Sequence, residues 1–176
     1  NICTAQALLA NVASMYAVYH GPEGLKDIAQ RVHDHASAFA ASVSSAGKEI
    51  VSRDFFDTVT VTGVDAAAIK SQLQEQGYLV RAIGSDKVAV SFGESATSED
   101  VTVLAAAFGA ESSVASEPAS SGSFEIPSSL QRAEAPLQHE VFNSIHSETQ
   151  MLRYLRTLAD KDLALDRTMI PLGSCT

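Results

Sequence analysis

The sequence predicts an α+β fold for residues 1–110, and a change of periodicity along the chain carries that prediction. Apolar residues first recur at three- and four-residue spacing, which is typical of amphipathic helices. From residue 55 the spacing changes to alternation, with many β-branched residues, as in half-buried strands. Helical and strand patterns then follow one another, so the expected order is α-α-β-α-β-β-α, a mixed unit of ordinary domain size.

The first two predicted helices are separated by a break at residues 20–22. Residues 4–19 form one apolar stripe, and Gly21 can adopt the left-handed conformation that ends a helix. Pro22 cannot donate a helical hydrogen bond, but it suits the first turn of a following helix. A second stripe over residues 25–43, closed by Gly47, predicts that following helix.

The next two predicted elements are a strand and a short helix. Residues 55–62 alternate and are rich in β-branched and aromatic side chains, so we expect a strand there. Asp65 is a suitable N-cap for a helix that extends through Gln76, with Gly77 as its terminator.

A hairpin and a last helix complete the predicted unit. Residues 78–83 and 87–92 read as strands, and the connection 84–86 contains Gly-Ser-Asp. Thr97 or Ser98 can cap the helix that follows, because a side-chain oxygen there can accept from free N–H groups.

The composition changes after the predicted unit. Residues 111–123 are mostly Ser, Ala, Glu and Pro, which is typical of a linker. Residues 124–145 contain two prolines and predict an extended arm without its own core. Ser147 can cap a helix through Leu158, with Gln150 at the capping-box position.

Charge and cysteine content narrow the classes of function. The net charge of −9 disfavours a nucleic-acid or anionic-membrane partner, because phosphates would be repelled. Residues 1–22 carry no formal charge, but their polar side chains exclude a membrane span. The two cysteines, Cys3 and Cys175, lie at opposite ends of the chain, which favours a reducing compartment over a disulfide-stapled fold.

The final residues are the strongest candidate for a site. Gly173 permits close approach of the backbone to a ligand, and Ser174, Cys175 and Thr176 offer polar side chains that can donate to oxyanions. An ordinary turn would use the same residue types.

The other candidate residues have simple structural interpretations. His33 and His35 lie two positions apart on a helix and point to different sides, so we expect solvated histidines and no metal site. His146 precedes a helix start, where free N–H groups favour anions, but a capped helix explains the neighbouring Ser147 and Glu148 fully and is the favoured interpretation. Arg153 could pair with Glu148 or Asp160, or bind a substrate carboxylate.

Three segments together resemble one family. The opening N-I-C-T-A-Q-A-L-L-A-N, the middle F-N-S-x-H-S-E-T from residue 142 and the closing M-I-P-L-G-S-C-T are similar to the P-protein of the glycine cleavage system. The resemblance implies a fold-type I architecture with two related halves. Residues 1–110 would then be the small C-terminal domain of the first half, 111–123 the linker, and 124–176 the N-terminal arm of the catalytic half.

The resemblance also implies a reaction. The family decarboxylates glycine through a pyridoxal phosphate aldimine and transfers the aminomethyl group to the lipoyl arm of H-protein. Ser174, Cys175, Thr176 and His146 would line the active site, and the cofactor lysine would lie outside this chain. We therefore expect an internal piece of a larger, dimeric, cytoplasmic or mitochondrial-matrix enzyme, inactive without the remainder of the P-protein.

Two alternatives stay open on the sequence. The first is the small domain of an aminotransferase-like enzyme that uses pyridoxal phosphate, which the closing P-L-G-S-C-T run disfavours. The second is a non-enzymatic α+β interaction module, whose apolar arm would dock on a partner.

Overall fold

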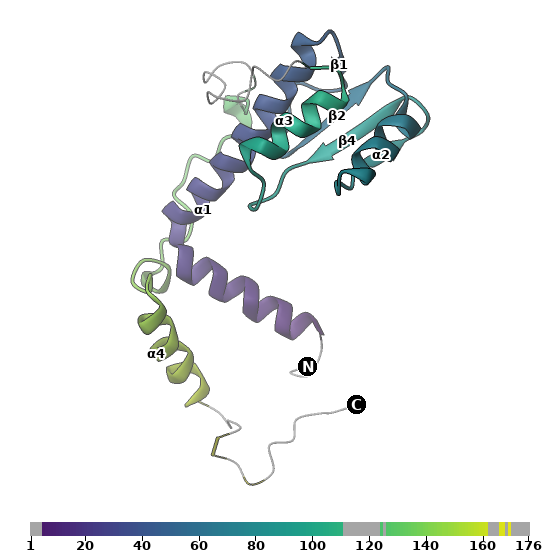
Figure 1. Ribbon diagram of the computed structural model, residues 1–176. Helices are drawn as coiled ribbons and strands as arrows, with labels where there is room; N and C mark the ends of the chain where they lie inside the picture. Colours follow the sequence, from purple (N-terminus) through teal and green to yellow (C-terminus); the bar gives the residue numbers. More distant parts are fainter. Residues whose placement is uncertain (1–4, 111–123, 125, 162–165, 168, 170–176) are drawn as a thin grey trace. The chain divides into compact units, whose positions relative to one another are not determined.

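The computed structural model describes residues 5–110, 124, 126–161, 166, 167 and 169. The chain divides into two compact units, one formed by Asn1–Asp27 with Ala133–Thr176 and the other by Ile28–Arg132 (Figure 1). This division reflects which residues contact one another in the structure. The boundaries at residues 110 and 123 instead divide two related halves that the sequence resemblance implies, and they stay predictions.

The first helical element, α1, spans Ala5–Ser45 and contains a break. Gly21 has φ 64° and ψ −176°, values that no helix contains and that favour glycine. Pro22 follows at once, in the first turn of the second helical segment. The expected pair of helices, with a break between them, is confirmed.

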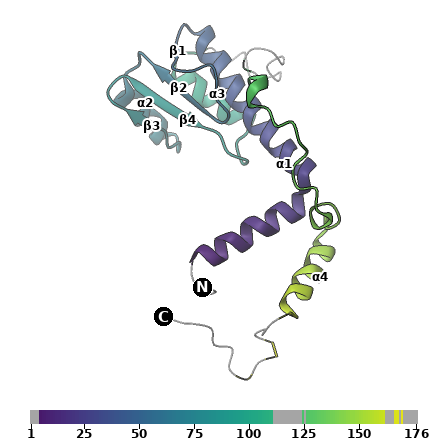
Figure 2. The ribbon, with the colours of Figure 1, turned by 180° about the vertical axis from the view of Figure 1, so that it is seen from behind.

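The unit Ile28–Arg132 contains a four-stranded antiparallel sheet in the order β1-β2-β4-β3. The strands are β1 (Glu49–Ile50), β2 (Thr58–Thr62), β3 (Arg81–Ile83) and β4 (Lys87–Ser91). Figure 2 shows β3 beside β4, the hairpin that the sequence predicts. The edge strand β1 was missed, because two residues are too few to show a periodic pattern.

Helices α2 (Ala66–Glu75) and α3 (Ser98–Ala107) begin where the sequence predicts. The carboxylate of Asp65 accepts a hydrogen bond from the Ala68 N–H at 3.0 Å, and Thr97 caps α3. Both caps satisfy N–H groups that a helix start leaves without partners.

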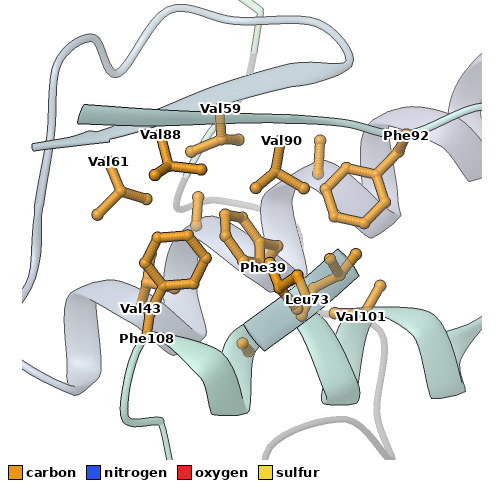
Figure 3. Close-up of a cluster of buried hydrophobic side chains, with 14 of the residues drawn as sticks. Phe39, Val43, Val59, Val61, Leu73, Val88, Val90, Phe92, Val101 and Phe108 are labelled. Atoms are coloured by element: carbon orange, nitrogen blue, oxygen red, sulfur yellow. The ribbon is translucent and has the colours of Figure 1, made fainter. Parts of the chain in front are cut away.

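The core of this unit lies between the sheet and its helices. Figure 3 shows valines of β2 and β4 above the aromatic rings of Phe39 and Phe108, with Leu73 beside them. The Phe39 ring is fully buried, with its centroid 5.7 Å from that of Phe92 and 5.4 Å from that of Phe108. Apolar burial of this kind is the main stabilising contribution in a domain of this size.

His33 contradicts the expectation of a solvated side chain. It is half-buried, with Nδ1 2.8 Å from the Phe56 carbonyl oxygen and Nε2 2.8 Å from that of Phe124. The Phe124 ring lies 5.3 Å from that of Phe55, and the Arg53 guanidinium stands 5.5 Å from its centroid. These long-range contacts attach the start of the arm to the α+β unit, and no local pattern could have indicated them.

Asp100 links the start of α3 to the segment before β3. Its Oδ2 accepts the Thr97 N–H at 2.7 Å, completing a capping box, and its Oδ1 accepts the Tyr78 hydroxyl at 2.7 Å. The Tyr78 hydrogen bond, together with those from Thr97, lowers the pKa of the Asp100 carboxyl. The same bond to Asp100 raises the pKa of Tyr78.

None of the arm's described residues is buried. An arm without its own core is what the sequence predicts there. It forms two 3-10 turns, η1 (Ser128–Leu130) and η2 (Glu140–Phe142), before helix α4 (Glu148–Ala159) begins. Within the described ranges, none of the helices is long and apolar enough to cross a membrane.

Two leucines close in sequence test the position of the core. Leu73 is 0% exposed and Leu79 is 88% exposed. We expect Leu73→Ala to lower the free energy of unfolding by about 2–5 kcal/mol, because it leaves a cavity. Leu79→Ala should change it by less than about 0.5 kcal/mol. Urea denaturation of both variants measures the difference, and equal losses would contradict this core.

Asp100 should make stability depend on pH. A carboxyl whose pKa is lowered by folding stabilises the fold above its unfolded pKa, near 3.9, and this contribution disappears as the pH falls through the folded value. Asp100→Asn should therefore have a lower free energy of unfolding than the wild type at neutral pH, and this difference should disappear in acid. In a Tyr78→Phe background, which lacks the hydroxyl donor to Asp100, the Asp100→Asn substitution should lower the free energy of unfolding by less. Urea unfolding at neutral and at acidic pH measures this difference. A difference that does not change with pH would refute the contribution of the Asp100 carboxylate.

Candidate functional site

The structure describes one of the four predicted site residues, His146. Ser174, Cys175 and Thr176 lie outside the described residues, as does Cys3. The geometry around His146 therefore defines the candidate site, and all of it belongs to the unit formed by Asn1–Asp27 and Ala133–Thr176.

His146 connects the arm to the first helical segment. Its Nδ1 lies 2.8 Å from the carbonyl oxygen of Tyr19, which is 127 positions away in sequence. A carbonyl oxygen can only accept, so Nδ1 carries the hydrogen and donates. In the neutral ring, Nε2 then holds the lone pair.

Gly21 lies next to the contact between His146 and Tyr19. A Cβ atom at Gly21 would stand 2.6 Å from the Phe142 carbonyl oxygen and 2.8 Å from His146 Cε1. No real side chain tolerates such distances. The glycine thus has two functions: it permits the positive φ of the helix break, and it allows the arm backbone to approach.

Side-chain hydrogen bonds hold the arm in shape where it meets the helix. The Asn143 side-chain amide donates to the carbonyl oxygens of Leu137 and His139, both at 3.0 Å. The Ser144 hydroxyl donates to the Glu140 carbonyl oxygen at 2.9 Å. These bonds order a segment that buries too little apolar surface to be ordered by packing.

Helix α4 (Glu148–Ala159) begins two residues after His146, with Ser147 between them as its N-cap. The Ser147 hydroxyl accepts the Gln150 N–H at 3.3 Å, which confirms the predicted cap. The Gln150 side-chain oxygen accepts the His146 N–H at 3.2 Å, where a capping box would use the N–H of Ser147. This shift of one residue ties His146 to α4 through its backbone.

The charged residues of α4 form a network at its end. Arg153 has no ion-pair partner among the described residues, so of its two alternatives the internal pairing with Glu148 or Asp160 is not seen, and binding of a substrate carboxylate stays a prediction. Arg156 instead pairs with Asp160 at 3.0 Å and contacts Asp166. The Arg156 hydrogen bond lowers the pKa of Asp166, and the same bond raises the pKa of Arg156. All these groups are exposed, so their contribution to stability is small.

The other unit contains an open hollow of about 530 Å³ between α2 and α3. Its walls are neutral, formed by Gln72, Gln76, Tyr78, Thr102, Val103, Ala106 and Ala107. In the part of the chain that the structure describes, no three His, Cys, Asp or Glu side chains gather as a metal site would require.

Comparison with known proteins decides the family. The model of the family described as "Glycine cleavage system P-protein" matches residues 1–108, more than half of the chain. The chain belongs to the glycine cleavage system P-protein family. This removes the aminotransferase-like alternative.

The match to individual P-proteins continues through the arm. Three bacterial proteins named "Glycine dehydrogenase (decarboxylating)" align with the whole chain: those of Stenotrophomonas maltophilia (56% identical), Xanthomonas euvesicatoria (53%) and Brucella canis (52%). The chain spans 18% of the length of each. The resemblance seen in the three sequence segments is thereby confirmed.

The contact between the arm and the helix break could not be foreseen in this P-protein segment. Gly21 and Pro22 indicated a break, and the H-S-E-T segment indicated a helix start. Neither signal says that the two places meet, because nothing local links positions 127 residues apart.

The cap of α4 can be tested by itself. Ser147→Ala removes the acceptor for the Gln150 N–H and should destabilise α4 by about 1 kcal/mol, whereas Ser147→Asp retains an acceptor. Amide hydrogen exchange over residues 150–152 reports the change. Equal protection in the alanine and aspartate variants would show that the cap does not stabilise the helix.

Proposed function

We propose that this chain is a structural and active-site-lining segment of a glycine decarboxylase. The observation that carries the proposal is 56% identity to a named glycine dehydrogenase along all 176 residues, arm included. In the proposed reaction, glycine loses its carboxyl group as CO2, and the aminomethyl group passes to the lipoyl arm of H-protein.

The proposed cofactor, pyridoxal phosphate, would supply the electron sink for decarboxylation when bound to the complete enzyme. Its lysine is not apparent in the described part of this chain. Lys26 pairs with Glu23 at 2.9 Å on an exposed surface, and the hollow between α2 and α3 contains no lysine. We propose that the cofactor lysine lies in another part of the protein, outside this chain.

The residues proposed to line the active site remain Ser174, Cys175, Thr176 and His146. The first three follow an arm that, in the proposed assembly, begins the catalytic half. A dimeric enzyme is proposed as the setting. The bacterial origin of the relatives favours the cytoplasm over a mitochondrial matrix.

Exposed apolar side chains support a segment that packs on further protein. Leu8, Leu9 and Val12 of α1 are 65%, 67% and 58% exposed, and Leu152 of α4 is 68% exposed. Three of these residues lie close together in the sequence of α1, and exposed apolar patches often mark contacts with another protein surface. The same observation supports the second candidate function, an interaction module without catalysis.

A complementation experiment separates the two candidates. The chain would be mixed with the remaining N- and C-terminal segments of the P-protein, and glycine-dependent CO2 exchange measured with lipoylated H-protein. We expect activity only in the complete mixture. The chain alone should show neither CO2 release nor the visible absorbance of bound pyridoxal phosphate.

Two controls make the result decisive. Omission of this chain from the mixture should abolish activity, and the uncut P-protein should be active under the same conditions. Activity of the chain alone would overturn its assignment as a segment. An active uncut protein, with folded but inactive pieces that do not bind this chain, would favour the independent module.

A further inference from the structure

The contact between His146 and Tyr19 joins two segments that the chain separates widely. Tyr19 lies in the last turn before the helix break at Gly21. Carbonyl groups at the end of a helix lack intrahelical donors, and His146 Nδ1 supplies one at 2.8 Å. The contact therefore satisfies a helix end as well as attaching the arm.

Steric complementarity reinforces this hydrogen bond. The Phe142 carbonyl oxygen and the His146 ring both occupy space that any side chain at position 21 would fill, with closest approaches of 2.6 Å and 2.8 Å to a Cβ. The arm thus rests on bare backbone at Gly21. Two independent features, a directed hydrogen bond and a close backbone approach, define the same position.

The same residue is coupled to the start of α4. The His146 N–H donates to Gln150, and the neighbouring Ser147 caps the helix. A ring fixed against Tyr19 therefore fixes the first turn of α4 as well. Segments fixed in this way are pre-organised, which lowers the entropy lost on reaching a reactive geometry.

We propose that His146 is a positioning residue: with Gly21 and Tyr19 it forms a clasp that holds the arm and the first turn of α4 in the geometry that catalysis requires. This inference rests on the proposed function, since it names which residues set the arm in place. In this proposal His146 acts through its Nδ1 contact with Tyr19 and takes no part in acid–base chemistry.

Substitutions at His146 separate the two roles. In the full-length P-protein, His146→Leu removes the donor, whereas His146→Asn places an amide N–H near the position of Nδ1. We expect His146→Leu to lower kcat by up to about 100-fold, as displaced active-site segments do. His146→Asn should retain most of the wild-type kcat and should show the pH profile of the wild type.

Two glycines provide the matched pair for the steric contact. Gly21 and Gly47 both have positive φ, 64° and 77°, but a Cβ at Gly47 would meet nothing within 4 Å. Alanine at either position strains the backbone, and only Gly21→Ala also displaces the arm. We expect Gly21→Ala to lower kcat as His146→Leu does, and Gly47→Ala to leave the activity of the folded enzyme unchanged.

Hydrogen exchange tests the clasp without reference to activity. The Met151 N–H donates to the Ser147 carbonyl oxygen at 2.9 Å in the first turn of α4. Its protection should fall in His146→Leu and Gly21→Ala and be retained in His146→Asn. Unchanged protection in all three variants would overturn the clasp. A different result would separate the two proposals. If the variants lose this protection but the uncut wild-type protein shows no glycine exchange, the clasp is upheld and the proposed function is refuted.

The kinetic outcome decides the role in catalysis. Rescue by His146→Asn supports positioning. A His146→Asn enzyme with normal amide protection, but with kcat lowered as far as in His146→Leu and a changed pH profile of the remaining activity, would overturn the proposal, because it would show that the imidazole itself takes part in proton transfer.

Discussion

The break in α1 at Gly21 and Pro22 is the constraint on which the arrangement of the first unit depends. A continuous helix would bury its backbone groups in its own hydrogen bonds and offer the arm only side chains. The break ends one helical segment at a residue without a Cβ and starts another at a residue without an N–H. The exposed backbone that results is the surface on which Phe142 and His146 rest.

The two units are stabilised in different ways. The α+β unit has an apolar core around Phe39, in which β2, β4 and three helical segments take part. Its polar contacts, such as that of Tyr78 with Asp100, fix elements that the core already holds. The described arm buries no side chain fully, so directed hydrogen bonds from Asn143, Ser144 and His146 must define its path.

This difference matters for the proposed function. A segment that lines an active site must be held within a fraction of an ångström, and a chain without a core cannot achieve this by packing. Backbone-directed hydrogen bonds provide the needed geometry at little cost in buried surface. The exposed apolar side chains of α1 and α4 remain available for contacts with the rest of a P-protein.

Local features were read correctly from the sequence. The caps at Asp65, Thr97 and Ser147 depend on side chains within three residues of the N–H groups that they bind, so their pattern alone reveals them. The alternation in β2 and β4 likewise reflects which face each residue turns to the core. Of the candidate site, the sequence identified His146 through a family resemblance, without indicating what its ring contacts.

The sequence by itself thus determined the helices, the main strands, the helix break and the family, because each of these depends on neighbouring residues or on long matched segments. The tertiary structure alone decided the partner of His146, the two carbonyl contacts of His33, the edge strand β1 and the link from Tyr78 to Asp100. The edge strand is too short to show a periodic pattern. The other contacts join positions far apart in the chain, and only packing brings their atoms within hydrogen-bonding distance.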